Sequence, residues 1–175
     1  VYITAPPSAD GDPAPEAPSA PSAADEHDYM PEKPDVELIG EFVEEGSDLI
    51  AKAEEALLRL ETDPEDTEAV GTVFRAFHTV KGTSAFLDLA IIAEMGHHAE
   101  SLLSRVRDRE IRYSGGYADL SLRALDMLKE LVRRVQGALG GGALFKPAGY
   151  DELLALLKDP EAAGISEAAE EGGAP

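Results

Sequence analysis

The sequence has no cysteine and no tryptophan, few aromatic residues and far fewer basic than acidic side chains. Without Cys, neither a disulfide framework nor a thiolate metal site can form. Fifteen Lys and Arg stand against 35 Asp and Glu, which gives a net charge of −20. A chain this acidic repels phosphate backbones, so we expect no nucleic-acid binding. The longest uncharged apolar stretch, residues 135–145, is interrupted by Gly and Gln and is shorter than the ~20 residues that span a bilayer. We therefore expect no membrane segment.

We expect no signal peptide in the amino-terminal residues. The chain begins Val-Tyr-Ile-Thr, which lacks both a basic region and an apolar region of the kind that secretory signals carry. Because the first residue is Val, we expect the chain to be a fragment or a processed product. The absence of Cys fits a reducing compartment, and we expect a cytoplasmic location.

Proline and charge are unevenly distributed and divide the chain into three parts. Residues 1–34 hold eight of the 12 prolines, seven acids and one base, a composition with too little apolar surface to offset the entropy of ordering. Residues 159–175 hold five acids and no base. We interpret both segments as disordered acidic linkers. Residues 35–158, with a net charge of −9, form the predicted domain, and linkers on both sides predict that it is one module of a longer chain.

Within residues 35–158 apolar side chains recur every three to four positions, the period of an amphipathic helix. Caps and breakers divide this pattern into five predicted helices: about 35–61; from a cap at Asp63 to about 86; from a cap at Asp88 through 106; from the glycines at 115–116 to about 139; and about 149–158. No stretch alternates with period two over the length of a strand. We predict an all-α fold, an antiparallel up-down-up-down four-helix bundle with a short fifth helix packed alongside or end-on.

His78 is the most informative residue of the second predicted helix. It lies beside the apolar stripe of Phe74, Phe77 and Val80 rather than at its centre, so its ring should reach solvent at the edge of the bundle. Lys81 follows three residues later on the same face and can offer a cation to an anion attached to the imidazole.

Gly82 adds a further feature to this face. Helical side chains lean toward the amino terminus, so a side chain at position 82 would overhang position 78, and glycine leaves that space empty. An accessible imidazole with a neighbouring cation suits reversible phosphorylation on nitrogen, because neutral imidazole is a nucleophile near pH 7 and phosphoryl transfer needs mainly positioning and charge neutralisation. From these residues alone, a surface histidine beside an ordinary helical Lys and Gly remains an alternative.

The stretch from Phe74 to Thr83 resembles the phosphorylation motif of histidine phosphotransfer (HPt) domains. It is most similar to the HPt, or P1, domain of CheA-type chemotaxis histidine kinases. A second match lies in register, since His97 and Glu100 occupy the positions at which the family carries a His and a Glu facing the phosphorylated histidine. The resemblance covers about residues 35–139 and excludes the linkers.

The resemblance implies a role for each of these residues. His78 would accept the phosphoryl group, and Glu100 would accept a hydrogen bond from its Nδ1–H, leaving the Nε2 lone pair free for attack. Lys81 would neutralise the phosphoryl group. His97 would be a polar neighbour of the site, whereas His98 would lie on the surface.

The resemblance also implies partners and an access surface. A receiver domain of a CheY-type response regulator would dock around His78, with Gly82, Phe77 and Thr79 on the docking face. A kinase catalytic domain, in the same polypeptide or its dimer partner, would supply the phosphoryl group. ATP and magnesium would bind to those partners, and we expect no cofactor to bind to this domain. Because the domain lacks an ATP-binding lobe, we expect that it is not an enzyme by itself. We also expect it to be monomeric. One departure from the family is Asp88, where many relatives carry Gly.

The sequence leaves three alternatives open. Glu94-x-x-His97 has the spacing found in di-iron bundles, but such sites need two of these pairs. His78, His97 and Glu100 could form a three-ligand zinc site, although Lys81 would then lie against the metal. The third alternative is a non-catalytic helical interaction bundle with an incidental histidine.

Overall fold

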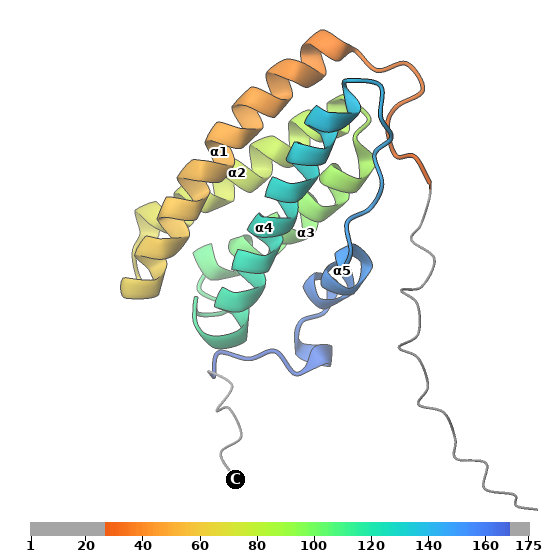
Figure 1. The fold of residues 1–175 in the computed structure, drawn as a ribbon. Coiled ribbons are helices and arrows are strands. Elements are labelled where there is room, and N and C mark those ends of the chain that lie inside the picture. Colours follow the sequence, from red (N-terminus) through yellow and green to blue (C-terminus); the bar gives the residue numbers. More distant parts are fainter. Residues whose placement is uncertain (1–26, 169–175) are drawn as a thin grey trace, which may run out of the picture.

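A computed structural model describes residues 27–168, and within them the protein is all-helical (Figure 1). The predicted fold class is confirmed. The helices are α1 (Val36–Thr62), α2 (Thr67–Phe86), α3 (Ala90–Arg107), α4 (Gly115–Ala138) and α5 (Tyr150–Lys158), followed by a 3-10 turn at Glu161–Ala163. None of the helices in this part of the chain is long and apolar enough to cross a membrane.

The four long helices run alternately up and down and close into a bundle (Figure 1). Each packs against the next, and α1 also contacts α4, while α5 lies against α3 and α4. The apolar stripe of each helix faces one shared core, where burying each large aliphatic side chain contributes about 1.5–3 kcal/mol. Fully buried members from every long helix include Leu57, Val73, Leu103 and Leu128.

The second helix begins later than its sequence predicts. Asp63 does not cap α2 but closes α1, since its backbone N–H donates to the Arg59 carbonyl at 2.9 Å. The N-cap is Asp66, whose Oδ1 accepts from the Ala69 backbone N–H at 2.9 Å while its Oδ2 accepts from Arg59 at 2.7 Å. The bond from Ala69 is the main reason that the pKa of Asp66 is lowered. Two acids three residues apart both satisfy the capping pattern, and the one that can also reach Arg59 is the cap.

The turn between α2 and α3 corrects the predicted role of Asp88. Asp88 does not cap α3, whose N-cap position is Leu89 with no side-chain hydrogen bond. Instead Asp88 adopts a left-handed conformation with φ 57°, and the next residue donates its N–H to the Ser84 carbonyl at 2.9 Å. This is the pattern in which a helix ends on a left-handed residue, a position that glycine occupies most readily.

Replacing Asp88 with glycine is therefore expected to stabilise the bundle. Relief of the left-handed strain should raise the free energy of unfolding by about 0.5–1 kcal/mol. Urea unfolding of Asp88→Gly beside Asp88→Ala measures this, and the alanine variant, which keeps the Cβ, should be no more stable than the parent chain. A glycine variant less stable than the parent would mean that the carboxylate itself contributes to stability.

Both ends of the described chain contact the bundle beyond the predicted domain limits of 35 and 158. The Tyr29 backbone N–H donates to the Leu144 carbonyl at 2.8 Å, and Asp28 Oδ1 accepts from the Leu144 N–H at 2.9 Å. After α5, Ile165 packs against the core. Short segments at 27–34 and 159–168 thus differ from the linkers expected there, and the rest of both predicted linkers lies outside the described residues.

Candidate functional site

His78 lies on α2 at the edge of the bundle, with 62% of its side chain exposed. The ring of Phe74, one turn earlier, is stacked against it, with 6.1 Å between the ring centroids and 16° between the planes. One face of the imidazole therefore lies against Phe74, and much of the rest of the ring is exposed to solvent. This position agrees with the prediction that His78 reaches solvent beside the apolar stripe.

Glu100 comes from the neighbouring helix α3 and fixes the orientation of the imidazole. Its Oε1 lies 3.1 Å from His78 Nδ1, and only 15% of its side chain is exposed. An ionised carboxylate can only accept, so the neutral ring carries its proton on Nδ1 and donates it to Glu100. The lone pair of the neutral imidazole is then on Nε2, away from the carboxylate.

Lys81 holds the other oxygen of the same carboxylate. Its Nζ lies 2.6 Å from Glu100 Oε2. Partial burial acts to raise the pKa of Glu100, but the bonds from Lys81 and then from His78 outweigh it and hold that pKa below its ordinary value. Glu100 is therefore ionised at neutral pH, and His78, Glu100 and Lys81 form one connected polar group.

Gly96 allows α2 and α3 to come close enough for this group to form. A Cβ placed at Gly96 would lie 3.3 Å from both Cα and Cβ of Lys81, which is tighter than ordinary contact. Gly96 is not among the predicted site residues, although a glycine inside a helical pattern costs about 1 kcal/mol relative to alanine and so indicates a packing requirement. The close approach brings Glu100, one turn further along α3, within reach of His78.

Of the residues predicted for the docking face, Gly82 is exposed and Phe77 is buried. A Cβ added at Gly82 would meet nothing within 4 Å, in agreement with the predicted vacancy. Phe77, by contrast, is only 1% exposed, so its predicted place on the docking face is wrong and its place on the apolar stripe is right. Thr79 is half-buried. Phe86, one turn beyond Gly82, is 77% exposed and was not identified from the sequence.

His97 does not lie in this group. Its side chain is exposed and its ring lies 5.0 Å from the ring of His98, and no hydrogen bond or ring contact joins it to His78 among residues 27–168. The role predicted for it has no support in the geometry. His98, expected on the surface, is half-buried, and burial followed by the nearby charge of His97 lowers its pKa.

The geometry does not favour the metal alternatives. Within residues 27–168 no three His, Cys, Asp or Glu side chains are grouped so that they could hold a metal ion. Lys81 occupies the second oxygen of Glu100, and Glu94 faces Lys158, with 3.6 Å between Oε1 and Nζ. The arrangement instead presents an oriented imidazole to solvent with a carboxylate behind it and a cation beside that carboxylate, which suits nucleophilic attack by nitrogen.

The chain is similar to one known family and to several known proteins. The family model described as Hpt domain matches residues 37–138. The chemotaxis protein CheA of Borreliella burgdorferi is 36% identical over 102 residues, which are 58% of this chain and 12% of that protein. The sensor histidine kinase CheAY of Helicobacter pylori is 34% identical over 96 residues, or 55% of this chain and 12% of that protein.

Two solved structures share the fold. The phosphorylated P1 domain of CheA3 in complex with CheY6 from R. sphaeroides is 26% identical with a TM-score of 0.63, covering 73% of this chain and 98% of that one. The CheA phosphotransferase domain from Thermotoga maritima is 30% identical with a TM-score of 0.56, covering 59% of this chain and 99% of that one. The chain thus corresponds to a whole solved domain and to a small part of the full-length relatives.

Proposed function

This chain belongs to the Hpt domain family, and on that premise we propose that it is the phosphoryl-carrying module of a chemotaxis-type histidine kinase. The observation that carries the proposal is the hydrogen bond between His78 Nδ1 and the half-buried Glu100 carboxylate. It leaves the nucleophilic Nε2 lone pair of the neutral ring at an exposed position. The likeness to a P1 domain in complex with CheY6 supports a response-regulator receiver as the partner that takes the group.

Phosphorylation has one bond forming and one breaking. Nε2 of His78 attacks the γ-phosphorus of ATP held by a kinase catalytic domain, the N–P bond forms, and the bridging P–O bond breaks to release ADP. The ring gains positive charge in this step while Nδ1 keeps its proton, and the ionised Glu100 stabilises that charge. Lys81 forms an ion pair with Glu100, and its ammonium carries N–H donors that can also meet the phosphoryl oxygens.

The second transfer returns the imidazole to its neutral form. A carboxylate oxygen of a receiver aspartate attacks the phosphorus, and the N–P bond breaks with its electron pair returning to Nε2. ATP and magnesium act on the kinase and receiver domains, and this chain supplies the nucleophile and the docking face. We propose that the face consists of Gly82, the exposed side of Thr79 and the exposed ring of Phe86.

Label transfer tests the proposal directly. The chain is mixed with the catalytic fragment of a chemotaxis histidine kinase and γ-labelled ATP, freed of nucleotide, and then given a CheY-type receiver with magnesium. We expect an acid-labile, alkali-stable label on the chain that moves to the receiver. The absence of label with several related kinase fragments would contradict the proposal and favour the interaction bundle with an incidental histidine.

A large side chain in place of Gly82 should slow phosphoryl transfer without lowering the stability of the bundle. Gly82→Leu removes a helical glycine, which favours the fold by about 1 kcal/mol, yet its side chain would overhang His78. We expect transfer to the receiver to slow by about tenfold or more. A tenfold slower rate corresponds to a loss of ~1.4 kcal/mol of the free energy with which docking stabilises the transition state. Rapid-quench measurement of label transfer checks this.

Gly137→Leu is the matched control for this variant. Gly137 is an exposed helical glycine of α4 where an added Cβ also meets nothing within 4 Å. It should show a similar gain in stability with an unchanged transfer rate. Equal rates in both variants would mean that the receiver does not approach over Gly82.

A further inference from the structure

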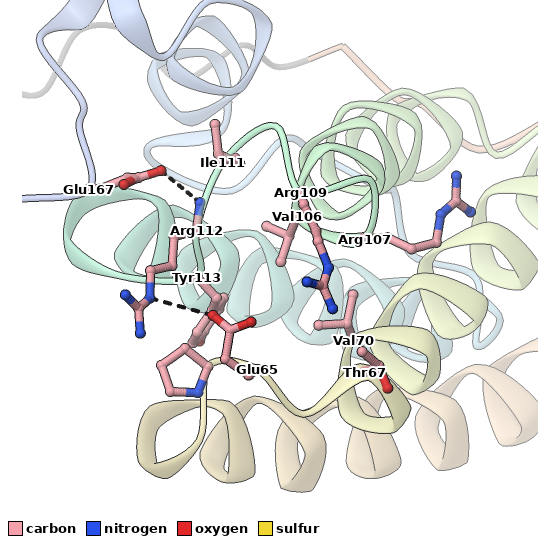
Figure 2. Close-up of a pocket in the computed structure, with 11 residues that line it drawn as sticks. Glu65, Thr67, Val70, Val106, Arg107, Arg109, Ile111, Arg112, Tyr113 and Glu167 are labelled. Atoms are coloured by element: carbon pink, nitrogen blue, oxygen red, sulfur yellow. Dashed lines mark hydrogen bonds and ion pairs between the residues drawn. The ribbon is translucent and has the colours of Figure 1, made fainter.

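A pocket of about 220 Å³ opens at the end of the bundle where the α1–α2 and α3–α4 loops meet (Figure 2). Its apolar wall comes from α2, the end of α3 and the following loop, and includes Val70, Val106 and Ile111. Three arginines line it as well: Arg107, Arg109 and Arg112. Two carboxylates, Glu65 and Glu167, line it too, so the pocket carries three cations and two anions in a chain whose net charge is −20.

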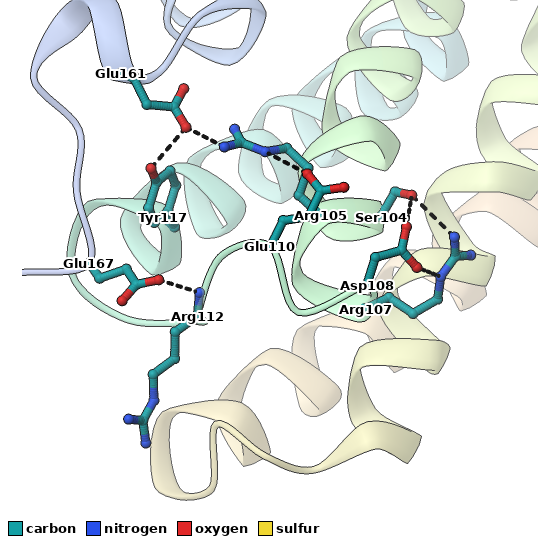
Figure 3. Close-up of polar contacts among 9 residues, drawn as sticks. All are labelled: Ser104, Arg105, Arg107, Asp108, Glu110, Arg112, Tyr117, Glu161 and Glu167. Carbon is teal, nitrogen blue, oxygen red and sulfur yellow. Dashed lines mark hydrogen bonds and ion pairs between the residues drawn. The ribbon is translucent and has the colours of Figure 1, made fainter.

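Two of the three arginines already have partners. The Arg112 backbone N–H donates to Glu167 Oε1 at 2.8 Å, and its Nε lies 3.8 Å from Glu65 Oε1. Both acids that line the pocket therefore face Arg112 (Figure 3 shows the bond from the Arg112 N–H to Glu167).

Arg107 is likewise engaged. It donates from Nε to Asp108 Oδ1 at 3.1 Å, and its guanidinium carbon lies 4.2 Å from the centroid of the Phe74 ring. Phe74 is the ring stacked on His78, so the pocket and the imidazole are joined by a short chain of contacts. The pocket itself is separate from the polar group of His78, Glu100 and Lys81.

Arg109 differs from the other two. In the part of the chain that the structure describes, no ion pair, hydrogen bond or ring contact is formed by its guanidinium, which extends beside Val106 toward Val70 (Figure 2). Its backbone is left-handed, with φ 61°, at the end of α3 where glycine would be less strained. The side chain of Arg109 is exposed, so its cationic head is free to meet a ligand that lies over the apolar recess.

We propose that this recess, which we call the arginine pocket, binds a small oxyanion carried on a compact apolar group. Arg109 donates to the oxyanion, and its planar guanidinium suits the two oxygens of a phosphate or carboxylate. The apolar body of the ligand covers Val70, Val106 and Ile111. This site goes beyond the phosphoryl-carrying function and does not depend on it, since no residue of the His78 group takes part.

Phenyl phosphate is the probe, titrated at millimolar concentration into the ¹⁵N-labelled 175-residue chain and followed by NMR. We expect saturable amide shifts at Val70, Arg109 and Ile111. Phenol, which has no charge, and inorganic phosphate, which has no apolar body, should each bind about tenfold more weakly or worse. Equal binding of inorganic phosphate would overturn the assignment of a ligand with an apolar group, and no saturable shift with phenyl phosphate would overturn the site.

Arg109→Gly separates ligand binding from folding. Because glycine suits the left-handed backbone, this variant should be at least as stable as the parent, while binding of phenyl phosphate falls by about tenfold or more. Arg123→Ala, which removes an exposed arginine of α4 that faces Asp119, controls for net charge and should bind as the parent does. Undiminished binding in Arg109→Gly, or an equal loss in Arg123→Ala, would overturn the proposal.

Discussion

Replacing His78 with glutamine is expected to abolish phosphorylation of the chain while the bundle remains folded. An amide nitrogen has no lone pair available for attack on phosphorus, so label from a kinase fragment should fall to background. The side chain is 62% exposed, and surface substitutions of this kind change the free energy of unfolding by about 0.5 kcal/mol or less. Label incorporation and urea unfolding of the same preparation measure the two effects separately.

His97→Gln and His98→Gln are the matched controls for this result. Both residues lie on α3, close to Glu100 in sequence, but neither is hydrogen-bonded to His78 among the described residues. Both variants should accept label as fast as the parent chain. Retained acid-labile label in His78→Gln would place the phosphorylated nitrogen elsewhere, and loss of label in His97→Gln would restore the role that the family resemblance implies for that residue.

The sequence pattern was sufficient wherever local periodicity and a single cap decide the structure. The predicted first helix, 35–61, differs by only one residue at each end from the observed α1. Its start is well defined because the Asp35 side chain accepts from the Leu38 N–H at 3.1 Å and caps the helix. The predicted pairing of His78 with Glu100 also agrees with the geometry. That pairing came from the family resemblance, since the periodicity of each helix does not specify how two helices are aligned.

The pattern was insufficient where competing local solutions have similar energies. Asp63 and Asp66 both fit the start of α2, and a tertiary contact with Arg59 distinguishes them. Asp88 fits a helix cap in sequence, but the backbone turns there through a left-handed conformation that composition does not reveal. Phe77 is adjacent to His78 in sequence, yet adjacent helical residues point about 100° apart, so it lies in the core.

The contacts at the two ends of the domain leave no periodic signal. Tyr29 and Met30 pack on the bundle before α1, and Ile165 packs on it after α5, within segments that are otherwise mostly polar. Glu161 accepts from the Tyr117 hydroxyl at 3.0 Å and pairs with Arg105, and that arginine is the main reason that the pKa of Glu161 is lowered to about 2. Such contacts join residues more than 40 positions apart and depend on where the helices already lie.

Replacing Glu100 should slow phosphorylation without removing the nucleophile. As Nε2 attacks phosphorus the imidazole becomes positively charged, and a hydrogen bond to a charged partner contributes about 1.5–3 kcal/mol. Loss of that contribution in the transition state corresponds to a rate about 10- to 100-fold lower in Glu100→Ala. Glu100→Gln keeps an acceptor for the Nδ1–H but loses the charge, so its rate should lie between those of the alanine variant and the parent. Single-turnover labelling with saturating kinase fragment measures both.

The control for these variants is Glu94→Gln, which neutralises an exposed acid of the same helix whose nearest cation is Lys158 at 3.6 Å. Its labelling rate should equal that of the parent, so that a general effect of net charge is excluded.

Lys81→Met supplies the second test, because it leaves the half-buried Glu100 without its cation and the pKa of Glu100 should rise toward its ordinary value. We expect its labelling rate at neutral pH to fall below that of the parent, since Glu100 and the phosphoryl oxygens both lose a neighbouring cation. Equal rates for Glu100→Ala and the parent would mean that the hydrogen bond orients the ring at rest and does not act in the transfer step.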